Sequence, residues 1–279
     1  MAHRLEKDRL SNLRDRALSA LVLGPLVLGV VWLGGWAYKA LIIAAALLAA
    51  REWVRMIAPG PLGRSFLVSF GAILLVVTLN LVVGPATALS VAMVLTLVAG
   101  LVPGAGCARV RGTDRWWAAF GIPYIGVSCV ALIWLRDDAL AGVVLIYFLL
   151  LSVWANDTGA FVVGRAIGGP RLAPSISPAK TWAGFWGGIA LAALALGGVA
   201  LALGAHMPLV AAALAAGLAV MSNVGDLFES AVKRRYNVKD SGGIIPGHGG
   251  LLDRIDGLLA AAPVLALFHW LIGSQLGWW

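Results

Sequence analysis

Four acidic residues in the second half of this sequence form two pairs with the same spacing. Asp226 and Glu229 are three residues apart, and so are Asp253 and Asp256. Residues at this spacing share one face of an α-helix, so each pair would present two carboxylates side by side. Proteins usually hold Mg²⁺ with one or two carboxylates together with the phosphates of a substrate. The spacing therefore predicts metal-assisted chemistry at a phosphate group.

Basic residues and glycines accompany both pairs. Lys233, Arg234 and Arg235 follow the first pair on the same expected helix, and five glycines lie within residues 242–250. Basic side chains neutralise phosphate oxygens, and glycine lets the backbone approach a ligand closely. Salt bridges from the carboxylates to Lys233, Arg234 and Arg254 are the alternative. We favour phosphate chemistry, because salt bridges alone would not require so many glycines.

Residues 164–182 mix glycine, proline, serine and basic residues. Ser177 followed by Pro178 predicts a helix start, with Ser177 as the N-cap. Lys180 and Thr181 would then lie in the first helical turn, beside the free amide groups of the helix N-terminus. This arrangement predicts a corner that binds phosphate. The alternative is that these basic residues only anchor the membrane topology.

Asn156 and Asp157 end an otherwise uncharged stretch. An aspartate at the end of a membrane helix is costly unless it pairs, is hydrated or binds a cation, which makes it a functional candidate. A polar turn that terminates the helix explains the same residues equally well.

The composition indicates the elements that must position these residues. The chain has 279 residues, of which 61% are hydrophobic and 12% charged, and its mean hydropathy is +0.91. Soluble domains carry about 25% charged residues. A membrane-spanning helix needs about 20 apolar residues, so two of the charge-free stretches are long enough for two helices each. The charge-free stretches are 17–38, 40–50, 65–108, 116–135, 139–156, 181–225 and 257–279.

We therefore predict an all-α polytopic membrane bundle of about nine spans. With a cytoplasmic N-terminus, 19 of the 21 Lys and Arg residues fall on the cytoplasmic side, and only Lys39 and Arg136 do not. The stretch 40–50 reaches spanning length only if Arg51, Glu52 and Arg55 extend their side chains towards water near the helix end.

Three regions follow from this arrangement. They are a basic cytoplasmic N-terminus (1–16), six spans without an assigned catalytic residue (17–155), and a catalytic membrane region (156–279) with cytoplasmic loops 156–180 and 225–256 and three spans.

Other features exclude several protein classes. The N-terminal apolar run is longer than that of a signal peptide, so we interpret it as a retained anchor. Cys107 and Cys129 lack the spacing of a zinc site or a disulfide framework. The net charge of +8 comes mostly from residues beside membrane spans, which attract anionic lipid headgroups, and does not indicate a nucleic-acid partner.

The 27 residues 230–256, SAVKRRYNVKDSGGIIPGHGGLLDRID, resemble the signature of phosphatidate cytidylyltransferases, also called CDP-diacylglycerol synthases. Residues 156–159, 172–182 and 225–230 are similar to that family as well. The sequence differs from the family pattern at Ala179 and Ala183, which make the loop less polar, and we leave both out of the site.

The resemblance implies an enzyme of phospholipid biosynthesis that converts CTP and phosphatidic acid into CDP-diacylglycerol and pyrophosphate with Mg²⁺. One or two cations would bridge the nucleotide phosphates and the carboxylates of Asp226, Asp253 and Asp256, and Lys233 would join these three as a catalytic residue. The expected substrate-binding residues are Asn156, Asp157, Ser177, Lys180, Thr181, Arg234, Lys239, Asp240, His248, Gly249, Gly250 and Arg254. The expected site lies on the cytoplasmic side of the cell membrane, with the lipid bilayer as a partner and a homodimer left open.

Two other functions are the alternatives to this enzyme. Phosphatidyltransferases that consume CDP-linked lipids also use paired aspartates, but with four-residue spacing and an Asp-Gly-x-x-Ala-Arg opening that this chain lacks. Transporters bind their substrates near the middle of the bilayer. Here almost every charge is expected at the cytoplasmic edge, and we expect no span to carry a carboxylate in its middle.

Overall fold

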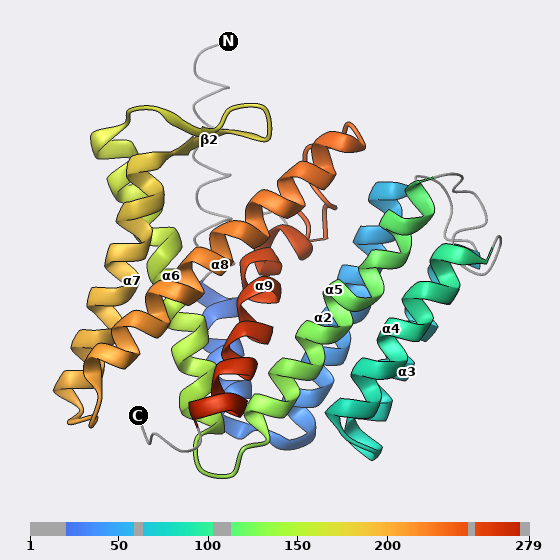
Figure 1. Ribbon diagram of the computed structural model, residues 1–279, viewed down its shortest axis with the longest axis horizontal. Helices are drawn as coiled ribbons and strands as arrows, with labels where there is room; N and C mark the ends of the chain where they lie inside the picture. Colours follow the sequence, from blue (N-terminus) through green and yellow to red (C-terminus); the bar gives the residue numbers. More distant parts are fainter. Residues whose placement is uncertain (1–20, 59–63, 103–112, 245–248, 274–279) are drawn as a thin grey trace.

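The computed structural model describes residues 21–58, 64–102, 113–244 and 249–273, and these residues are mostly α-helical. Each predicted span contains a helix (Figure 1). The helices are Leu21–Leu33, α2 (Gly35–Ile57), α3 (Arg64–Val82), α4 (Pro85–Leu101), α5 (Asp114–Arg136), α6 (Gly142–Ile167), α7 (Trp182–Ala202), α8 (Pro208–Arg235) and α9 (Leu252–Phe268), which a π-helical turn (His269–Gly273) extends.

Five of these helices are long and apolar enough to cross a membrane: α5, α6, α7, α8 and α9 with its π-helical turn. Leu21–Leu33, Leu67–Val82 and Pro85–Leu101 are apolar but shorter. The prediction that this is a helical membrane protein is therefore confirmed.

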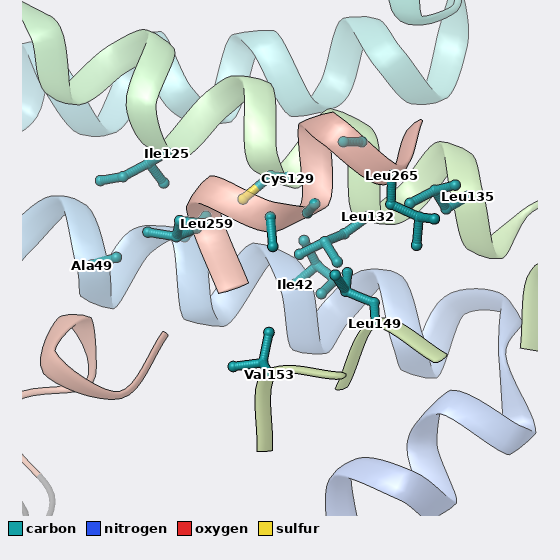
Figure 2. Packing of buried hydrophobic residues seen from close by; sticks show 14 of the residues in the cluster. Ile42, Ala49, Ile125, Cys129, Leu132, Leu135, Leu149, Val153, Leu259 and Leu265 are labelled. Carbon is teal, nitrogen blue, oxygen red and sulfur yellow. The ribbon is translucent and has the colours of Figure 1, made fainter. Parts of the chain in front are cut away.

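The core forms where α2, α5, α6 and α9 meet. Figure 2 shows Ile42 of α2, Leu132 of α5, Leu149 of α6 and Leu265 of α9 packed against one another. Cys129 of α5 is buried in the same cluster and has a free thiol, as expected of a cysteine that acts as a small hydrophobic residue. Cys107 lies outside the described residues.

Close approach of α6 and α7 depends on glycine. A Cβ added at Gly159 of α6 would lie 2.7 Å from the carbonyl oxygen of Gly187 and 3.0 Å from the Cα of Gly188. A larger residue at this crossing would separate the two helices. This contact sets the distance between the helix that carries Asp157 and the helix that follows Lys180.

The predicted helix start at Ser177 is wrong, and the fold is therefore not purely α-helical. Ser177–Thr181 forms strand β2, which pairs antiparallel with β1 (Arg171–Ala173). The helix α7 begins at Trp182, and the side chain of its N-cap, Thr181, accepts a hydrogen bond from the Gly184 amide at 3.1 Å. Local capping signals at Ser177 were overridden because β1 offers these residues a partner for backbone hydrogen bonds.

The predicted helix end at Asn156 is also wrong. Apolar residues continue after Asp157, and α6 ends only at Ile167. Gly168 and Gly169 follow with φ angles of 67° and 91°, which glycine adopts without strain. Asn156 and Asp157 therefore lie within a helix.

One end of the molecule carries the segments that contain most of the predicted site residues. Figure 1 shows the β1–β2 hairpin, the last turns of α8 and the first turn of α9 at the same end of the bundle. The α5–α6 connection lies at the opposite end. There Lys39 pairs with Asp137 at 2.9 Å, and Arg136 Nε donates to the carbonyl oxygen of Val31 at 2.7 Å. Lys39 and Arg136, the only two basic residues that were not predicted on the cytoplasmic side, thus lie together at this opposite end.

Candidate active site

A cavity of about 1350 Å³ is lined by residues of α6, the hairpin, α8 and α9, together with the helix Leu21–Leu33. Part of its wall is charged and includes Asp157, Lys180, Asp226, Lys233, Asp240, Asp253, Arg254 and Asp256. Another part is apolar and includes Leu23, Val27, Leu41, Val153, Phe161 and Phe185. The predicted metal ligands and Lys233, which are up to 30 positions apart in the sequence, therefore meet at one cavity.

Asp226 is paired with the hairpin. Lys180 Nζ on β2 lies 2.6 Å from Asp226 Oδ2 on α8, and Ser230 Oγ donates to Asp226 Oδ1 at 3.3 Å. The Lys180 and Asp226 side chains are 23% and 40% exposed, so a ligand in the cavity can reach both. A bound phosphate would compete with Asp226 for Lys180 and would free a carboxylate oxygen.

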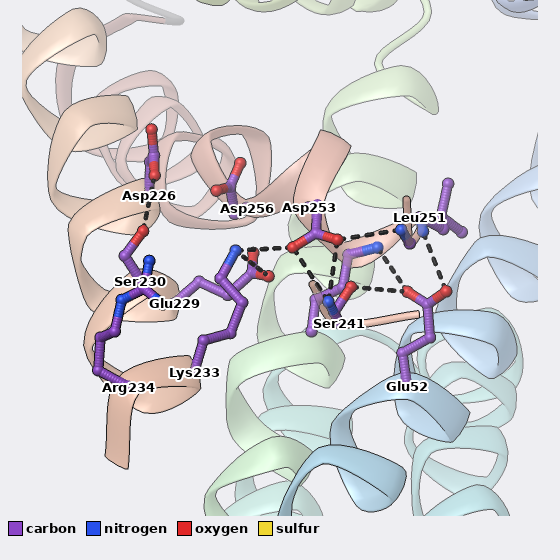
Figure 3. Close-up of polar contacts among 12 residues, drawn as sticks. Glu52, Asp226, Glu229, Ser230, Lys233, Arg234, Ser241, Leu251, Asp253 and Asp256 are labelled. Carbon is purple, nitrogen blue, oxygen red and sulfur yellow. Dashed lines mark hydrogen bonds and ion pairs between the residues drawn. The ribbon is translucent and has the colours of Figure 1, made fainter. Parts of the chain in front are cut away.

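Lys233 lies between two carboxylates (Figure 3). Its Nζ is 2.6 Å from Asp253 Oδ1 and 3.3 Å from Glu229 Oε1. The Glu229 side chain is fully buried and the Lys233 side chain is 12% exposed. The salt bridges weighed as the alternative are thus formed in part, and they fix Lys233 at the cavity wall.

Asp253 binds the backbone as well as Lys233. Its Oδ2 accepts hydrogen bonds from the amides of Ser241 and Gly250, both at 3.0 Å. The glycine-rich segment before α9 is therefore tied to the carboxylate that begins this helix. In this arrangement Asp253 is engaged on both oxygens, and its role as a metal ligand stays a prediction.

Asp256 lies one turn further along α9, where α8 and α9 approach closely. Its Oδ1 accepts a hydrogen bond from the Gly257 amide at 2.7 Å. A Cβ added at Gly225 of α8 would lie 2.5 Å from the Asp256 carbonyl oxygen. Glycine immediately before Asp226 therefore allows the carboxylates of the two helices to line the same space.

The donor set is suited to a cation that also binds a substrate. Asp157, Asp226 and Asp256 all line the cavity. Within the described ranges, no three acidic, His or Cys side chains converge closely enough to hold a metal ion by themselves. Mg²⁺ does not require such a cage, because substrate phosphates and water complete its coordination.

Asn156 and Asp157 belong to a polar chain between two helices. Asn223 Nδ2 on α8 donates to Asn156 Oδ1 at 2.8 Å, and Asn156 Nδ2 lies 3.4 Å from Asp157 Oδ1. Asn156 is 1% exposed, whereas Asp157 lines the cavity. The expectation that no span carries a carboxylate in its middle is therefore wrong for α6, because this helix continues past Asp157.

The remaining predicted substrate-binding residues fall into two groups. Thr181, Asp240 and Arg254 line the cavity. Arg234 is exposed and its Nε donates to the carbonyl oxygen of Ile176 at 3.2 Å, so it joins α8 to the hairpin. The predicted residues that are described but absent from the cavity wall are Asn156, Ser177, Arg234, Lys239, Gly249 and Gly250. His248 lies outside the described residues.

Sequence reasoning missed several residues near these groups. Arg171, Ser222 and Asn223 line the cavity. Arg171 was interpreted only as a residue that anchors the membrane topology, and Ser222 and Asn223 lie in an apolar stretch that gave no signal of a site. Glu52 of α2 is buried and binds the start of α9. An acidic residue inside a predicted span was the signal that could have identified it.

The chain is similar to known proteins over most of its length. Residues 14–272 match the cytidylyltransferase family. A phosphatidate cytidylyltransferase of Brucella suis is 42% identical over 270 residues, which cover 93% of this chain and 94% of the relative. The chain belongs to the cytidylyltransferase family. This finding confirms the resemblance read from residues 230–256 and the expected enzyme class.

Two further relatives carry the same name. The phosphatidate cytidylyltransferase of Pseudomonas aeruginosa is 37% identical over 267 residues, covering 94% of this chain and 98% of the relative. That of Bacillus subtilis is 41% identical over 150 residues, covering 52% and 56%. Membership of this family argues against both a phosphatidyltransferase and a transporter.

Proposed function

We propose that the cavity is the active site of a membrane enzyme that converts CTP and phosphatidate into CDP-diacylglycerol and pyrophosphate. The family supports the reaction, and one observation carries its assignment to this cavity. Charged residues of the hairpin, α8 and α9 share a single space with apolar residues such as Val27 and Phe161. A nucleotide triphosphate suits the charged part, and the acyl chains of a lipid suit the apolar part.

The reaction needs positioning and charge neutralisation more than proton transfer. An oxygen of the lipid phosphate attacks the α-phosphorus of CTP and forms a new P–O bond. The bond from the α-phosphorus to the oxygen shared with the β-phosphate breaks, and pyrophosphate leaves with that oxygen. The attacking phosphate is already anionic at neutral pH, so no side chain has to act as a strong base.

The residues of the cavity have separate roles in this scheme. Lys180 and Arg254 neutralise the phosphates of CTP and orient them. Lys233, held by Asp253 and Glu229, presents its charge at a fixed place on the wall. Asp226 and Asp256, with Asp253 as the third predicted ligand, would hold one or two Mg²⁺ ions that stabilise the negative charge of the reacting phosphates.

The proposal includes a topology. Nine spans with a cytoplasmic N-terminus put the hairpin and the α8–α9 segment in the cytoplasm, where CTP is available. The sorting of 19 of 21 basic residues supports this orientation in the inner or plasma membrane. A homodimer stays a prediction, to be checked by the mass of the detergent-solubilised protein.

Purified protein in detergent is incubated with labelled CTP, phosphatidate and Mg²⁺. We expect a labelled CDP-lipid and one pyrophosphate for each CTP consumed. Chelation should stop the reaction, and added Mg²⁺ should restore it. If no CDP-lipid forms under any metal condition, the proposed function is wrong; if it forms equally well after chelation, only the metal assignment is wrong.

A further inference from the structure

Glu52 lies in the half of the chain to which the sequence assigned no catalytic residue. It belongs to α2, only 2% of its surface is exposed, and the cavity does not include it. Figure 3 shows its carboxylate directed towards Leu251 and Ser241, which precede α9. A buried carboxylate is costly unless hydrogen-bond donors surround it, so this contact calls for a functional or structural reason.

The Glu52 carboxylate caps α9 from another helix. The amide of Leu251 donates to Glu52 Oε1 at 3.1 Å, and the amide of Leu252 donates to Oε2 at 2.8 Å. Amides at a helix N-terminus have no partner within their own helix. An acidic side chain there satisfies these donors and interacts favourably with the helix dipole. Glu52 therefore fixes where α9 begins.

The glycine-rich segment is shaped around the same carboxylate. Ser241 Oγ donates to Glu52 Oε2 at 3.3 Å. A Cβ added at Gly242 would lie 2.5 Å from Glu52 Oε1, and one added at Gly250 would lie 2.8 Å from Oε2. A Cβ at the neighbouring Gly243 would meet nothing within 4 Å. A side chain at Gly242 or Gly250 would therefore displace the Glu52 carboxylate or the Ser241 hydroxyl.

Glu52 and Asp253 hold the two ends of this segment together. Asp253 accepts from the amides of Ser241 and Gly250, while Glu52 accepts from the Ser241 hydroxyl and from the residues that follow Gly250. Asp253 also binds Lys233. Displacement at Glu52 would therefore move Asp253 and, through it, the ammonium group of Lys233.

We propose that Glu52 is a positioning residue, which places Ser241 and the start of α9 so that Asp253 and Lys233 reach their positions at the active site. The inference rests on the proposed function of that site. Glu52 acts through these residues without touching the cavity itself.

The first test is Glu52→Gln, which keeps the shape of the side chain but replaces one acceptor oxygen with an NH₂ group facing a backbone donor. We expect kcat per folded molecule to fall by about tenfold or more, since small displacements of catalytic groups are costly. The KM for CTP should change less than kcat, because Lys180 on the hairpin does not depend on Glu52 and still binds the phosphates of CTP.

The matched control is Trp53→Phe, which removes a different, partly buried hydrogen bond of α2. Trp53 Nε1 donates at 3.0 Å to the carbonyl oxygen of Trp117, which lies on α5 and not in the glycine-rich segment. Both variants should lower Tm. Only Glu52→Gln should lower kcat, which separates positioning from a purely structural role.

A second pair of variants leaves Glu52 intact. Gly242→Ala places a methyl group against the Glu52 carboxylate and should lower kcat, whereas Gly243→Ala should keep it within about twofold of the wild type. The double variant Glu52→Gln with Gly242→Ala should be no slower than the slower single variant, because both disturb one contact.

The outcomes are distinguishable. If the wild-type protein forms no CDP-lipid, the proposed function fails. If it is active and folded Glu52→Gln keeps its kcat, the positioning role is refuted. If Glu52→Gln does not fold, the glycine pair decides: equal activity of Gly242→Ala and Gly243→Ala refutes the role, and a loss confined to Gly242→Ala supports it.

Discussion

Carboxylates with the same spacing have different surroundings at the residue scale. Asp226 faces the cavity and pairs with Lys180, whereas Asp253 is occupied by Lys233 and two backbone amides. Asp256 accepts a hydrogen bond from the amide of its neighbour Gly257 and lines the cavity. Identical side chains should therefore respond differently to the same substitution.

Asp256→Asn and Asp253→Asn test this difference. Both should reduce turnover by about a hundredfold or more, because the predicted metal loses a charged ligand or Lys233 loses its position. Only Asp253→Asn should also lower Tm, since its NH₂ group would face amides that now donate to a carboxylate. Activity and thermal melting are measured on the same preparations. Retained turnover in Asp256→Asn would contradict the metal-ligand assignment.

Lys180→Gln tests phosphate binding from the hairpin. The loss of a charged hydrogen bond to CTP should raise its KM by about tenfold, with a smaller effect on kcat. Lys39→Gln is the matched control, because Lys39 forms a similar ion pair with Asp137 at the opposite end of the molecule. The KM is measured by steady-state kinetics with varied CTP. Equal KM values for the two variants would contradict the assignment of Lys180 to phosphate binding.

At the element scale, short connections fix the ends of long helices. The α5–α6 connection is an example, since the amides of Leu140 and Ala141 donate to Asp138 Oδ1 at 3.0 and 2.8 Å. His269 Nε2, from the turn that extends α9, lies 3.0 Å from Asp138 Oδ2. This one carboxylate thus connects the start of α6 with the end of α9.

These contacts predict a pH dependence of stability. Burial alone would raise the pKa of Asp138, but the amide of Ala141, the side chain of His269 and the amide of Leu140 together hold this pKa below its usual value. The unfolded chain therefore binds a proton at Asp138 more readily than the folded chain does. The contribution of Asp138 to stability is present above the ordinary aspartate pKa of about 4, and it is lost as the pH falls through the lower folded-state pKa.

Thermal melting of Asp138→Asn checks this dependence. The variant should melt below the wild type at pH 6 and should lose less of its Tm on acidification, since it has no carboxylate at position 138 to protonate. Parallel loss of Tm in both proteins between pH 6 and pH 3 would contradict the role of Asp138.

For the whole molecule, the two ends differ in the chemistry they can perform. The hairpin, the last turns of α8 and the start of α9 form one end, and the α5–α6 connection lies at the other (Figure 1). A site that takes CTP from water and phosphatidate from lipid has to lie at one membrane surface. The cavity has both a charged and an apolar wall, which suits the proposed site.

Single cysteines test which end faces the cytoplasm. Ser175→Cys in the exposed turn of the hairpin and Leu140→Cys, at a residue that is 93% exposed in the α5–α6 connection, are made in a chain whose own cysteines are replaced by serine. In intact cells, a membrane-impermeant maleimide should label the residue-140 variant and leave the residue-175 variant unlabelled. After membrane disruption both should react. The reverse pattern would overturn the proposed orientation.

The sequence alone determined the membrane class and the family, and it predicted most of the charged residues that line the cavity. Scarcity of charge does not depend on folding, and a run such as residues 230–256 identifies a family wherever it lies in space. Helix positions also followed from local composition, because apolar stretches of spanning length form helices to satisfy their own backbone groups.

Only the tertiary structure decided which partner each polar group has. Ser177 carries strong local capping signals, yet its strand pairs with β1, and Asn156 bonds to Asn223, 67 positions away. The sequence predicted that the Glu52 side chain extends towards water near a helix end. In the structure Glu52 instead accepts hydrogen bonds from amides about 200 positions later in the chain. Such contacts depend on how helices pack, and local propensity contains no information about them.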